Sequence, residues 1–521
     1  MCLHFKMIRT TMCASACWGM LIWCNGATAQ TVTPWLTKGD QSALMEMQEQ
    51  SSMVPYLGGG TTILVDSTAV YQSIDGFGFC LTQGSAEVIN GMESETKASL
   101  LNDLFGPFGL GISMLRISLG ASDLSNSVYT YNDSPGDVDM LNFSLEGPDL
   151  DHLIPLLQEI LAINPSIKLM ASPWTAPTWM KTNNYWIGGS LNPQYYGAYS
   201  LYFLRYLQEM ESYGIDIWAI TPQNEPANQW NQPSMLMSAS EQIAFINDHL
   251  GPDLASSDFS PKIIAYDHNC DNTAYPISVL NESPYVDGAA FHMYAGSISA
   301  LTTVKEATGK NVYFTEQYTD VNGDFDGDMG WHMENVLIGS LNNWSKCVLE
   351  WNLATDSSYG PHTQFGCSDC LGALTIQSET QYDTNVSYYI VGHASKFIQP
   401  DAVRINVTSS SSKLLVTGFK NPDNTLAILA YNFWGGLDDA EEIELVIGSQ
   451  KIDFTIPPRS IVTFSVSNSD EVFVQEVDQN QARELVKIID LTGRETVFKP
   501  NRPLIYMYSD GTHQRVMRSD W

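Results

Sequence analysis

Two glutamates of this chain stand where an acid and a nucleophile could act on one bond. Glu225 lies in the run Thr221-Pro222-Gln223-Asn224-Glu225-Pro226, and Glu316 closes the β-prone run Tyr313–Glu316. A carboxylic acid can protonate a leaving oxygen while a second carboxylate attacks the neighbouring carbon, which is the chemistry that breaks a glycosidic bond. A single glutamate at a strand end is more often solvated or salt-bridged, so the hypothesis depends on the pair.

The elements that must position these glutamates alternate between strands and helices. Between Asp75 and Trp351 the chain has eight short apolar, β-prone runs, with room for a helix between most of them. The runs span residues 75–79, 115–119, 168–172, 217–221, 263–267, 289–293, 312–316 and 347–351. This alternation predicts an α/β protein with a (β/α)8 TIM barrel, whose active site lies at the carboxyl ends of the strands. The fourth and seventh strands would then bring both glutamates to one central pit.

Polar and aromatic residues also gather just past the ends of the predicted strands. They are Asp123, Trp174, Asn224, Glu225, His292, Glu316 and Trp351. The amide of Asn224 could hold a sugar hydroxyl beside the acid. The tryptophans could stack on sugar rings, although a tryptophan is more often part of a core.

The pattern changes after about residue 385. Segments 413–419, 426–432, 442–447 and 460–466 alternate apolar and polar residues between turn-forming pairs, which predicts an antiparallel β-sandwich. The strand-like run Thr61–Gln72 could complete it. The expected organisation is a signal peptide over 1–29, an N-terminal segment contributing to the sandwich over 30–74, a catalytic barrel over 75–385, the sandwich over 386–468 and a small C-terminal β module over 469–521.

The first residues predict export. Lys6 and Arg9 precede an apolar run over 12–23, and the small residues Ala27-Thr28-Ala29 fit cleavage before Gln30. A lipid anchor on Cys17 or Cys24 is the alternative. No other stretch is long and apolar enough for a membrane span. We therefore expect a periplasmic, cell-surface or extracellular protein.

The composition limits the partners. Against 25 Lys and Arg stand 58 Asp and Glu, a net charge of -33 that repels phosphate backbones and anionic lipid and so disfavours nucleic-acid or membrane-surface binding. The 13 Trp and 24 Tyr suit sugar or aromatic ligands. Five cysteines lie outside the signal, an odd number. Cys367 and Cys370 could form a local disulfide or stay as two buried thiols, and a structural zinc site lacks a second pair of ligands.

The chain resembles glycoside hydrolase family 30, the retaining β-glycosidases that include glucosylceramidases. The resemblance covers roughly residues 40–468 and rests on motifs spread in family order along the barrel. These motifs are Asp75-Gly76-Phe77-Gly78, Arg116 with Ser122-Asp123, Ala171 to Lys181, Thr221 to Pro226, His292 with Tyr294, Glu316, and Glu350-Trp351-Asn352-Leu353.

The resemblance implies a role for each candidate site residue and no metal or cofactor. Glu225 would be the acid/base, Glu316 the nucleophile, and Asn224 the residue that holds the sugar 2-hydroxyl. Asp123, Trp174 and Trp351 would line the pocket for the non-reducing sugar, Arg116 would support the nucleophile, and His292 and Tyr294 would lie beside it. We also expect Arg116 to keep Glu316 ionised and the charge of Glu316 to raise the pKa of Glu225.

Two features bear on the substrate. The chain has His292-Met293-Tyr294 where glucosylceramidases tend to have His-Trp-Tyr, and Tyr359 to His362 with the Cys367–Cys370 loop is more similar to the branches that include β-1,6-glucanases. We therefore expect a β-glucan or β-glucoside substrate. The rival function is a carbohydrate-binding protein on the same fold without catalysis. The sequence leaves the linkage, exo or endo action and the oligomeric state open.

The tail after about Ser469 has strand-like runs at Val486–Arg494 and Pro503–Tyr508. They resemble the C-terminal sorting domains of the type IX secretion route, although Gly511 to Arg515 departs from the usual ending. A plain accessory hairpin is the alternative.

Overall fold

The computed structural model describes residues 30–435, 439–468, 485–490, 494, 496–497, 504–508 and 513–516. The chain divides into two compact units, residues 1–468 and 469–521. The predicted signal peptide and the alternative anchor at Cys17 or Cys24 lie outside the described residues. No helix in the described ranges is long and apolar enough to cross a membrane.

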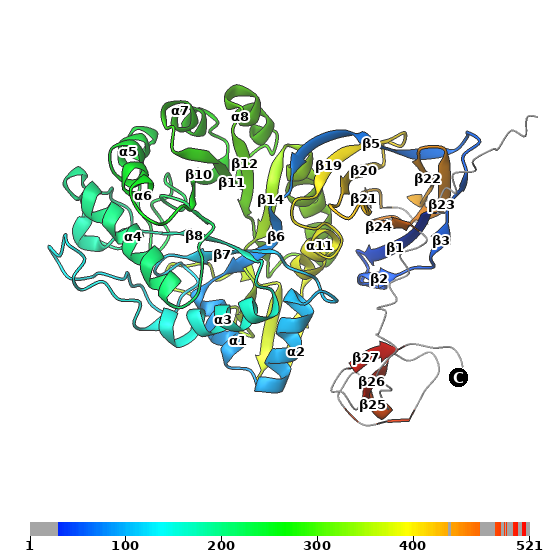
Figure 1. The fold of residues 1–521 in the computed structure, drawn as a ribbon, viewed down its shortest axis with the longest axis horizontal. Helices are drawn as coiled ribbons and strands as arrows, with labels where there is room; N and C mark the ends of the chain where they lie inside the picture. The colour runs from blue at the N-terminus through cyan, green and yellow to red at the C-terminus, as the bar shows by residue number, and fades with distance from the viewer. Residues whose placement is uncertain are drawn as a thin grey trace, which may run out of the picture. The chain divides into compact units, whose positions relative to one another are not determined.

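The first unit contains a closed barrel of eight parallel strands, as predicted (Figure 1). The strands are β6 (Gly76–Leu81), β7 (Met114–Ser118), β8 (Lys168–Ser172), β9 (Ala219–Ile220), β10 (Lys262–Cys270), β11 (Val286–Gly296), β12 (Asn311–Glu316) and β14 (Ser345–Glu350). Most of their residues are buried, because helices cover the outside and side chains fill the inside.

The helices follow the strands around the outside of the barrel (Figure 1). They are α1 (Gln83–Asn90), α2 (Ser94–Phe105), α3 (Ile154–Ile163), α4 (Tyr196–Ser212), α5 (Ala239–Phe245), α6 (Gly251–Ala255), α7 (Ala274–Glu282), α8 (Ala300–Thr308), α9 (Phe325–His332), α10 (Ile338–Asn342) and α11 (Val386–Ser395). Local sequence sets their ends. Ser238 and Glu241 form a capping box at the start of α5, and Gly309 ends α8 with a φ of 70°.

Two small sheets follow the barrel strands that carry the site. β13 (Thr319–Asp320) pairs with β16 (Cys370–Leu371), and β15 (Ala354–Asp356) pairs with β17 (Leu374–Ser378), which pairs with β18 (Gln381–Thr384). β13 begins three residues after Glu316 and β15 begins three residues after Trp351. These sheets therefore fix the loops beside both residues.

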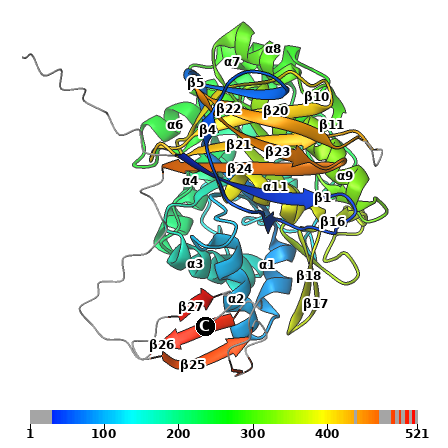
Figure 2. The same ribbon diagram turned by 90° about the vertical axis from the view of Figure 1, so that its right-hand side faces the viewer.

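An eleven-stranded sheet forms the second part of the first unit (Figure 2). Its strands are β1 (Gln30–Lys38), β2 (Glu46–Met47), β3 (Ser51–Ser52), β4 (Val54–Pro55), β5 (Thr61–Ser73), β19 (Val403–Ser409), β20 (Leu414–Lys420), β21 (Leu426–Asn432), β22 (Glu441–Ile447), β23 (Gln450–Ile456) and β24 (Ser460–Asn468). β1 pairs with β24 along its whole length, and β5 pairs with β19 and, in parallel, with β22. Strands that precede the barrel in the chain and strands that follow it thus share one apolar core.

Helix α11 joins the barrel to this sheet, since it contacts β6, β14 and β24. Its buried His393 hydrogen-bonds the hydroxyls of Thr463 and Thr37 on two sheet strands. The exact domain limits stay a prediction.

The second unit contains an antiparallel sheet of β25 (Leu485–Asp490), β26 (Leu504–Tyr508) and β27 (His513–Val516). β26 falls within the predicted run Pro503–Tyr508, and β25 overlaps the predicted run Val486–Arg494 but begins one residue before it. The third strand, β27, was not predicted. It lies in the region that departs from the usual sorting ending, and it pairs with β26. A sorting role for this unit stays a prediction.

Candidate active site

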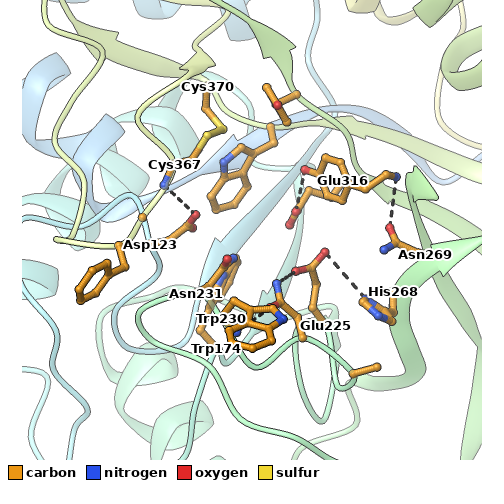
Figure 3. A pocket seen from close by; sticks show the side chains of 17 residues that line it. Asp123, Trp174, Glu225, Trp230, Asn231, His268, Asn269, Glu316, Cys367 and Cys370 are labelled. Carbon is orange, nitrogen blue, oxygen red and sulfur yellow. Dashed lines mark hydrogen bonds and ion pairs between the residues drawn. A yellow bond between two sulfur atoms is a disulfide. The ribbon is translucent and has the colours of Figure 1, made fainter. Parts of the chain in front are cut away.

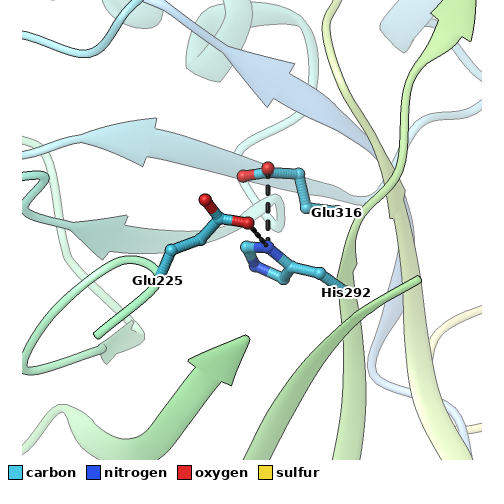
Figure 4. Close-up of side chains that lie close together, drawn as sticks. All are labelled: Glu225, His292 and Glu316. Atoms are coloured by element: carbon cyan, nitrogen blue, oxygen red, sulfur yellow. Dashed lines mark hydrogen bonds and ion pairs between the residues drawn. The ribbon is translucent and has the colours of Figure 1, made fainter. Parts of the chain in front are cut away.

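The two glutamates lie within reach of one bond. Glu316 is the last residue of β12, and Glu225 lies five residues after the short strand β9, where its φ is 46°. A hydrogen bond of 2.9 Å from the Glu225 amide to the carbonyl oxygen of Asp267 holds this unusual backbone conformation. One carboxylate oxygen of each glutamate and one nitrogen of His292 lie within 4.8 Å of one another (Figure 4).

A buried network of ion pairs and hydrogen bonds holds Glu316 in place. Arg116 donates to Glu316 Oε2 at 2.6 Å, to Asn224 Oδ1 at 2.6 Å and to Asp267 Oδ2 at 2.8 Å. The groups that donate to the two oxygens of Asp267 are Arg116, Ser172, Thr221, Thr315 and His292. Asp267 therefore balances the charge of Arg116 and leaves Glu316 fixed at the edge of the network.

His292 connects the two glutamates. Its Nδ1 lies 3.1 Å from Glu225 Oε1 and 3.5 Å from Glu316 Oε1, and its Nε2 lies 3.1 Å from Asp267 Oδ1 (Figure 4). Burial disfavours the charged imidazole, but the charge of Glu316 and the hydrogen bonds to Asp267 and Glu225 raise the pKa of His292 to about 10. A protonated His292 thus stands between two carboxylates.

This placement reverses the expected order of the carboxyl pKa values. Burial raises the pKa of Glu316 above its usual value, although His292 and Arg116 oppose the rise. Burial also acts to raise the pKa of Glu225, but the hydrogen bond and charge of His292 lower it overall. The expected net rise in the pKa of Glu225 was wrong, because the expectation left out a cation in contact with Glu225.

A cavity of about 530 Å³ opens in front of the glutamates (Figure 3). The candidate residues that line it are Asp123, Trp174, Glu225, Tyr294, Glu316 and Trp351. Arg116 and His292 lie behind this surface and are almost fully buried. Asn224 is buried beside Trp174 and Glu225. The structure thus brings all nine candidates to one place.

Aromatic rings and a phenol shape the cavity wall. The rings of Trp174 and Trp351 lie 5.4 Å apart at 33°, and the guanidinium of Arg116 lies 4.9 Å from the Trp174 ring centre. The hydroxyl of Tyr294 donates to Glu316 Oε1 at 3.0 Å. Both oxygens of Glu316 therefore accept a hydrogen bond, one from Arg116 and one from Tyr294.

Several residues at the site were missing from the sequence prediction. Asp267 closes a predicted barrel strand, and a carboxylate at a strand end was the signal that could have found it. Asn228 donates to Glu225 Oε2 at 2.6 Å, and His268 Nδ1 lies 3.8 Å from Glu225 Oε1. Trp230 also lines the cavity. It lies on a loop, where no strand or helix period marks a side chain as facing the site.

The comparisons with known proteins agree with this fold. The family model described as the glycosyl hydrolase family 30 TIM-barrel domain matches residues 74–398, and the one described as the family 30 beta-sandwich domain matches residues 401–464. The chain belongs to glycosyl hydrolase family 30. It is therefore a glycoside hydrolase, and a binding protein without catalysis is not the function that these matches support.

Relatives within family 30 carry two kinds of name. The chain is 32% identical over 425 residues to an endo-1,6-β-D-glucanase of Aspergillus fumigatus, with 75% of this chain and 85% of the relative covered. It is 27% identical to the lysosomal acid glucosylceramidase of Mus musculus, covering 80% and 85%. A solved endo-β1,6-glucanase structure superimposes with a TM-score of 0.79 at 33% identity and covers 83% of this chain and 98% of its own.

The family 30 site also contains a group of atoms that could hold a cation. Glu225, His292 and Glu316 offer donor atoms within 4.8 Å of one another, which is a possible ligand set. Each of these side chains already has a hydrogen-bond or ion-pair partner in the network described above. Hydrogen bonds and ion pairs thus engage these donor atoms, and a metal-free site stays a prediction.

Removing Asp267 should destabilise the enzyme strongly. Asp267→Ala leaves Arg116 and His292 buried without their shared anion, and we expect a loss of about 3–5 kcal/mol in the free energy of unfolding measured by urea denaturation at pH 6. Glu159→Ala, which removes a partly exposed partner of Lys97, should cost less than about 1 kcal/mol and serves as the control.

The loss should also depend on pH. Since the pKa of His292 is raised from 6.5 to about 10, its charge stabilises the fold fully below about pH 6.5 and progressively less toward pH 10. The cost of Asp267→Ala should therefore shrink between pH 6 and pH 9.5. A cost equal to that of Glu159→Ala at pH 6 would contradict the network.

Proposed function

We propose that this family 30 enzyme is a retaining β-glycosidase that hydrolyses β-glucosidic bonds of glucans, with Glu316 as nucleophile and Glu225 as acid/base. The observation that carries the mechanism is the separation of the two carboxylates, whose nearest oxygens lie within 4.8 Å. Retaining enzymes place the two carboxyl groups about 5–5.5 Å apart, whereas inverting enzymes leave about 6.5–9.5 Å for a water molecule. This spacing supports direct attack by Glu316 on the sugar.

The proton for the leaving group can come from the pair formed by Glu225 and His292. In the free enzyme the proton lies on His292, hydrogen-bonded to Glu225 Oε1. As Glu316 attacks the anomeric carbon and the bond from that carbon to the leaving oxygen breaks, Glu316 loses its negative charge, which removes the strongest support for the charged imidazole. In the same step the pKa of His292 falls, and its Nδ1 proton passes to Glu225 and on to the leaving oxygen. Water attack reverses the path as Glu316 is released.

Other side chains would hold the sugar in this reaction. Trp174 and Trp351 offer ring faces, and Asp123 offers a carboxylate acceptor in the same cavity. The side-chain amide oxygen of Asn224 accepts a hydrogen bond from Arg116. The amide nitrogen of Asn224 is then the group that can donate to the 2-hydroxyl.

A glucan is the substrate that the relatives and the cavity favour. Relatives named endo-1,6-β-D-glucanases cover most of the chain. Trp230 is 76% exposed at the cavity, and its amide donates to Asn228, which donates to Glu225. Because this exposed ring is connected to the proposed acid, we place it on the side of the leaving group, where a polymer would place its next sugar unit.

Digestion of β-1,6-glucan tests this function. Proton NMR should show the β-anomer of the new reducing end first, and first formation of the α-anomer would exclude retention. Trp230→Ala should lower kcat/KM on the glucan by about 10- to 100-fold. It should leave hydrolysis of β-glucosyl fluoride nearly unchanged, because fluoride does not reach the ring. Trp434→Ala, an exposed tryptophan of the sandwich, is the matched control.

We further infer that the protein is exported, on the strength of the charged and apolar segments before Gln30. Mass spectrometry of the protein from the envelope or medium of producing cells should find a mature N-terminus at Gln30. A lipid-modified Cys17 or Cys24 would instead establish the anchor.

A further inference from the structure

We propose that the disulfide between Cys367 and Cys370 is a positioning element of the sugar site, which holds the carboxylate of Asp123 in place to bind a substrate hydroxyl. The proposal rests on the proposed function in one respect, that Asp123 contacts the sugar. It assigns to the disulfide a role in substrate binding and none in bond cleavage.

Asp123 has the features of a carboxylate that can bind a ligand. Its residue is only 5% exposed, yet it lines the cavity beside Trp174 and Trp351. Its Oδ2 accepts a hydrogen bond of 3.3 Å from the backbone amide of Cys367, whereas its buried Oδ1 has no partner among the described residues (Figure 3). A buried acceptor without a partner costs free energy, which a hydroxyl donor from a bound sugar would recover.

The chain from Thr363 to Cys367 lies directly against Asp123. The amide of Thr363 donates to the carbonyl oxygen of Asp123 at 2.8 Å, and the amide of Gly366 donates back to Thr363 at 3.1 Å. A Cβ atom on Gly366 would clash with the carbonyl group of Asp123, so only glycine allows this approach. The contact brings the Cys367 amide to the carboxylate.

The disulfide adds a covalent tie between this segment and the rest of the site. Ser368 and Asp369 between the two cysteines are exposed, whereas Cys370 is buried in β16. β16 pairs with β13, which begins three residues after Glu316. Cys370 also packs in one cluster with Trp174 and Trp351. A covalent bond therefore links Cys367, whose amide holds Asp123, to Cys370, which lies in the strand paired with β13 and packs with both tryptophans.

Without the disulfide the Cys367 amide can move away from Asp123. The carboxylate would then lose its one described side-chain hydrogen bond and its fixed orientation, while Glu225, Glu316 and His292 keep their own partners in the ion network. Substrate binding should weaken more than the chemical step. Reduction by a dithiol opens the bond with two protons and two electrons, giving two thiols and the cyclic disulfide of the reagent.

The test compares native enzyme, dithiol-reduced enzyme and the variant Cys367→Ser/Cys370→Ser on an aryl β-glucoside. We expect KM to rise about 10-fold with kcat within about 2-fold, and reoxidation of the reduced enzyme to restore KM. The dithiol should have no effect on the double serine variant, which shows that the free thiols of Cys80, Cys270 and Cys347 are not involved. Reduced enzyme with unchanged KM would overturn the proposal even if the double variant fails to fold.

A double-mutant cycle with Asp123→Ala separates this role from a general loosening of the fold. Opening the disulfide in the Asp123→Ala background should change KM by less than about 2-fold, because the group it positions is gone. An equal, additive rise in both backgrounds would overturn the proposal. If Asp123→Ala alone leaves KM unchanged in active enzyme, the sugar-binding role of Asp123 fails, whereas absence of hydrolysis in the native enzyme would count against the proposed function itself.

Discussion

Glu316→Ala should abolish hydrolysis of every β-glucoside and β-glucan, and added azide should restore turnover with formation of an α-glycosyl azide. The variant removes the carboxylate that would attack the sugar, while Glu225 and His292 remain to protonate the leaving group. The loss should exceed the roughly 10²- to 10⁴-fold value of general acid–base catalysis, because the covalent route itself is lost. A small anion can enter the space of the missing carboxylate and attack from the same face, which gives the α product.

Kinetics on an aryl β-glucoside and NMR of the azide product are the measurements. Glu334→Ala, which changes an exposed glutamate just after α9, should keep native activity and serves as the matched control. Circular dichroism must show that Glu316→Ala is folded, since Arg116 loses one of its two carboxylate partners. Native-like activity of the folded variant would show that Glu316 is not the nucleophile.

Glu225→Ala should have an effect that depends on the leaving group. Glucans and alkyl glucosides need a proton on the departing oxygen, so their kcat/KM should fall by about 10²- to 10⁴-fold. The aryl group of an activated aryl glucoside leaves without that proton. The rate of the first step on such substrates should therefore fall much less. Because the glycosyl-enzyme on Glu316 still forms, azide should intercept it and give the β-glycosyl azide.

The plot of log kcat/KM against the pKa of the leaving group measures this effect. It should be steep for Glu225→Ala and shallow for the unmodified enzyme. If Glu316→Ala gave the β-glycosyl azide and Glu225→Ala gave the α-glycosyl azide, the roles of Glu225 and Glu316 would be exchanged. Equal losses for good and poor leaving groups would mean that Glu225 does not deliver the proton.

Local sequence patterns determined the barrel and the positions of its strand ends. Strands such as Lys168–Ser172 are short, apolar and separated by helix-length segments, which predicts a parallel sheet covered by helices, and eight such units are the number that a closed barrel requires. Glu316 ends its strand in both the prediction and the structure. The period of two also revealed several sheet strands after residue 400, although β19 and β23 were not among the segments named.

Tertiary structure alone decided how the groups at those strand ends act on one another. Asp267, His292 and Glu225 come from different strands, and their contacts of about 3 Å depend on how the barrel closes, which no local pattern encodes. The direction of a pKa shift follows from burial and from the nearest charge, so placing His292 against Glu225 reversed the expected order. The tertiary structure likewise decided between a disulfide and two thiols at Cys367 and Cys370, and it placed the Cys367 amide against Asp123. Sequence determines which chemical groups are available at the barrel mouth, and the packed fold determines their distances, charges and partners.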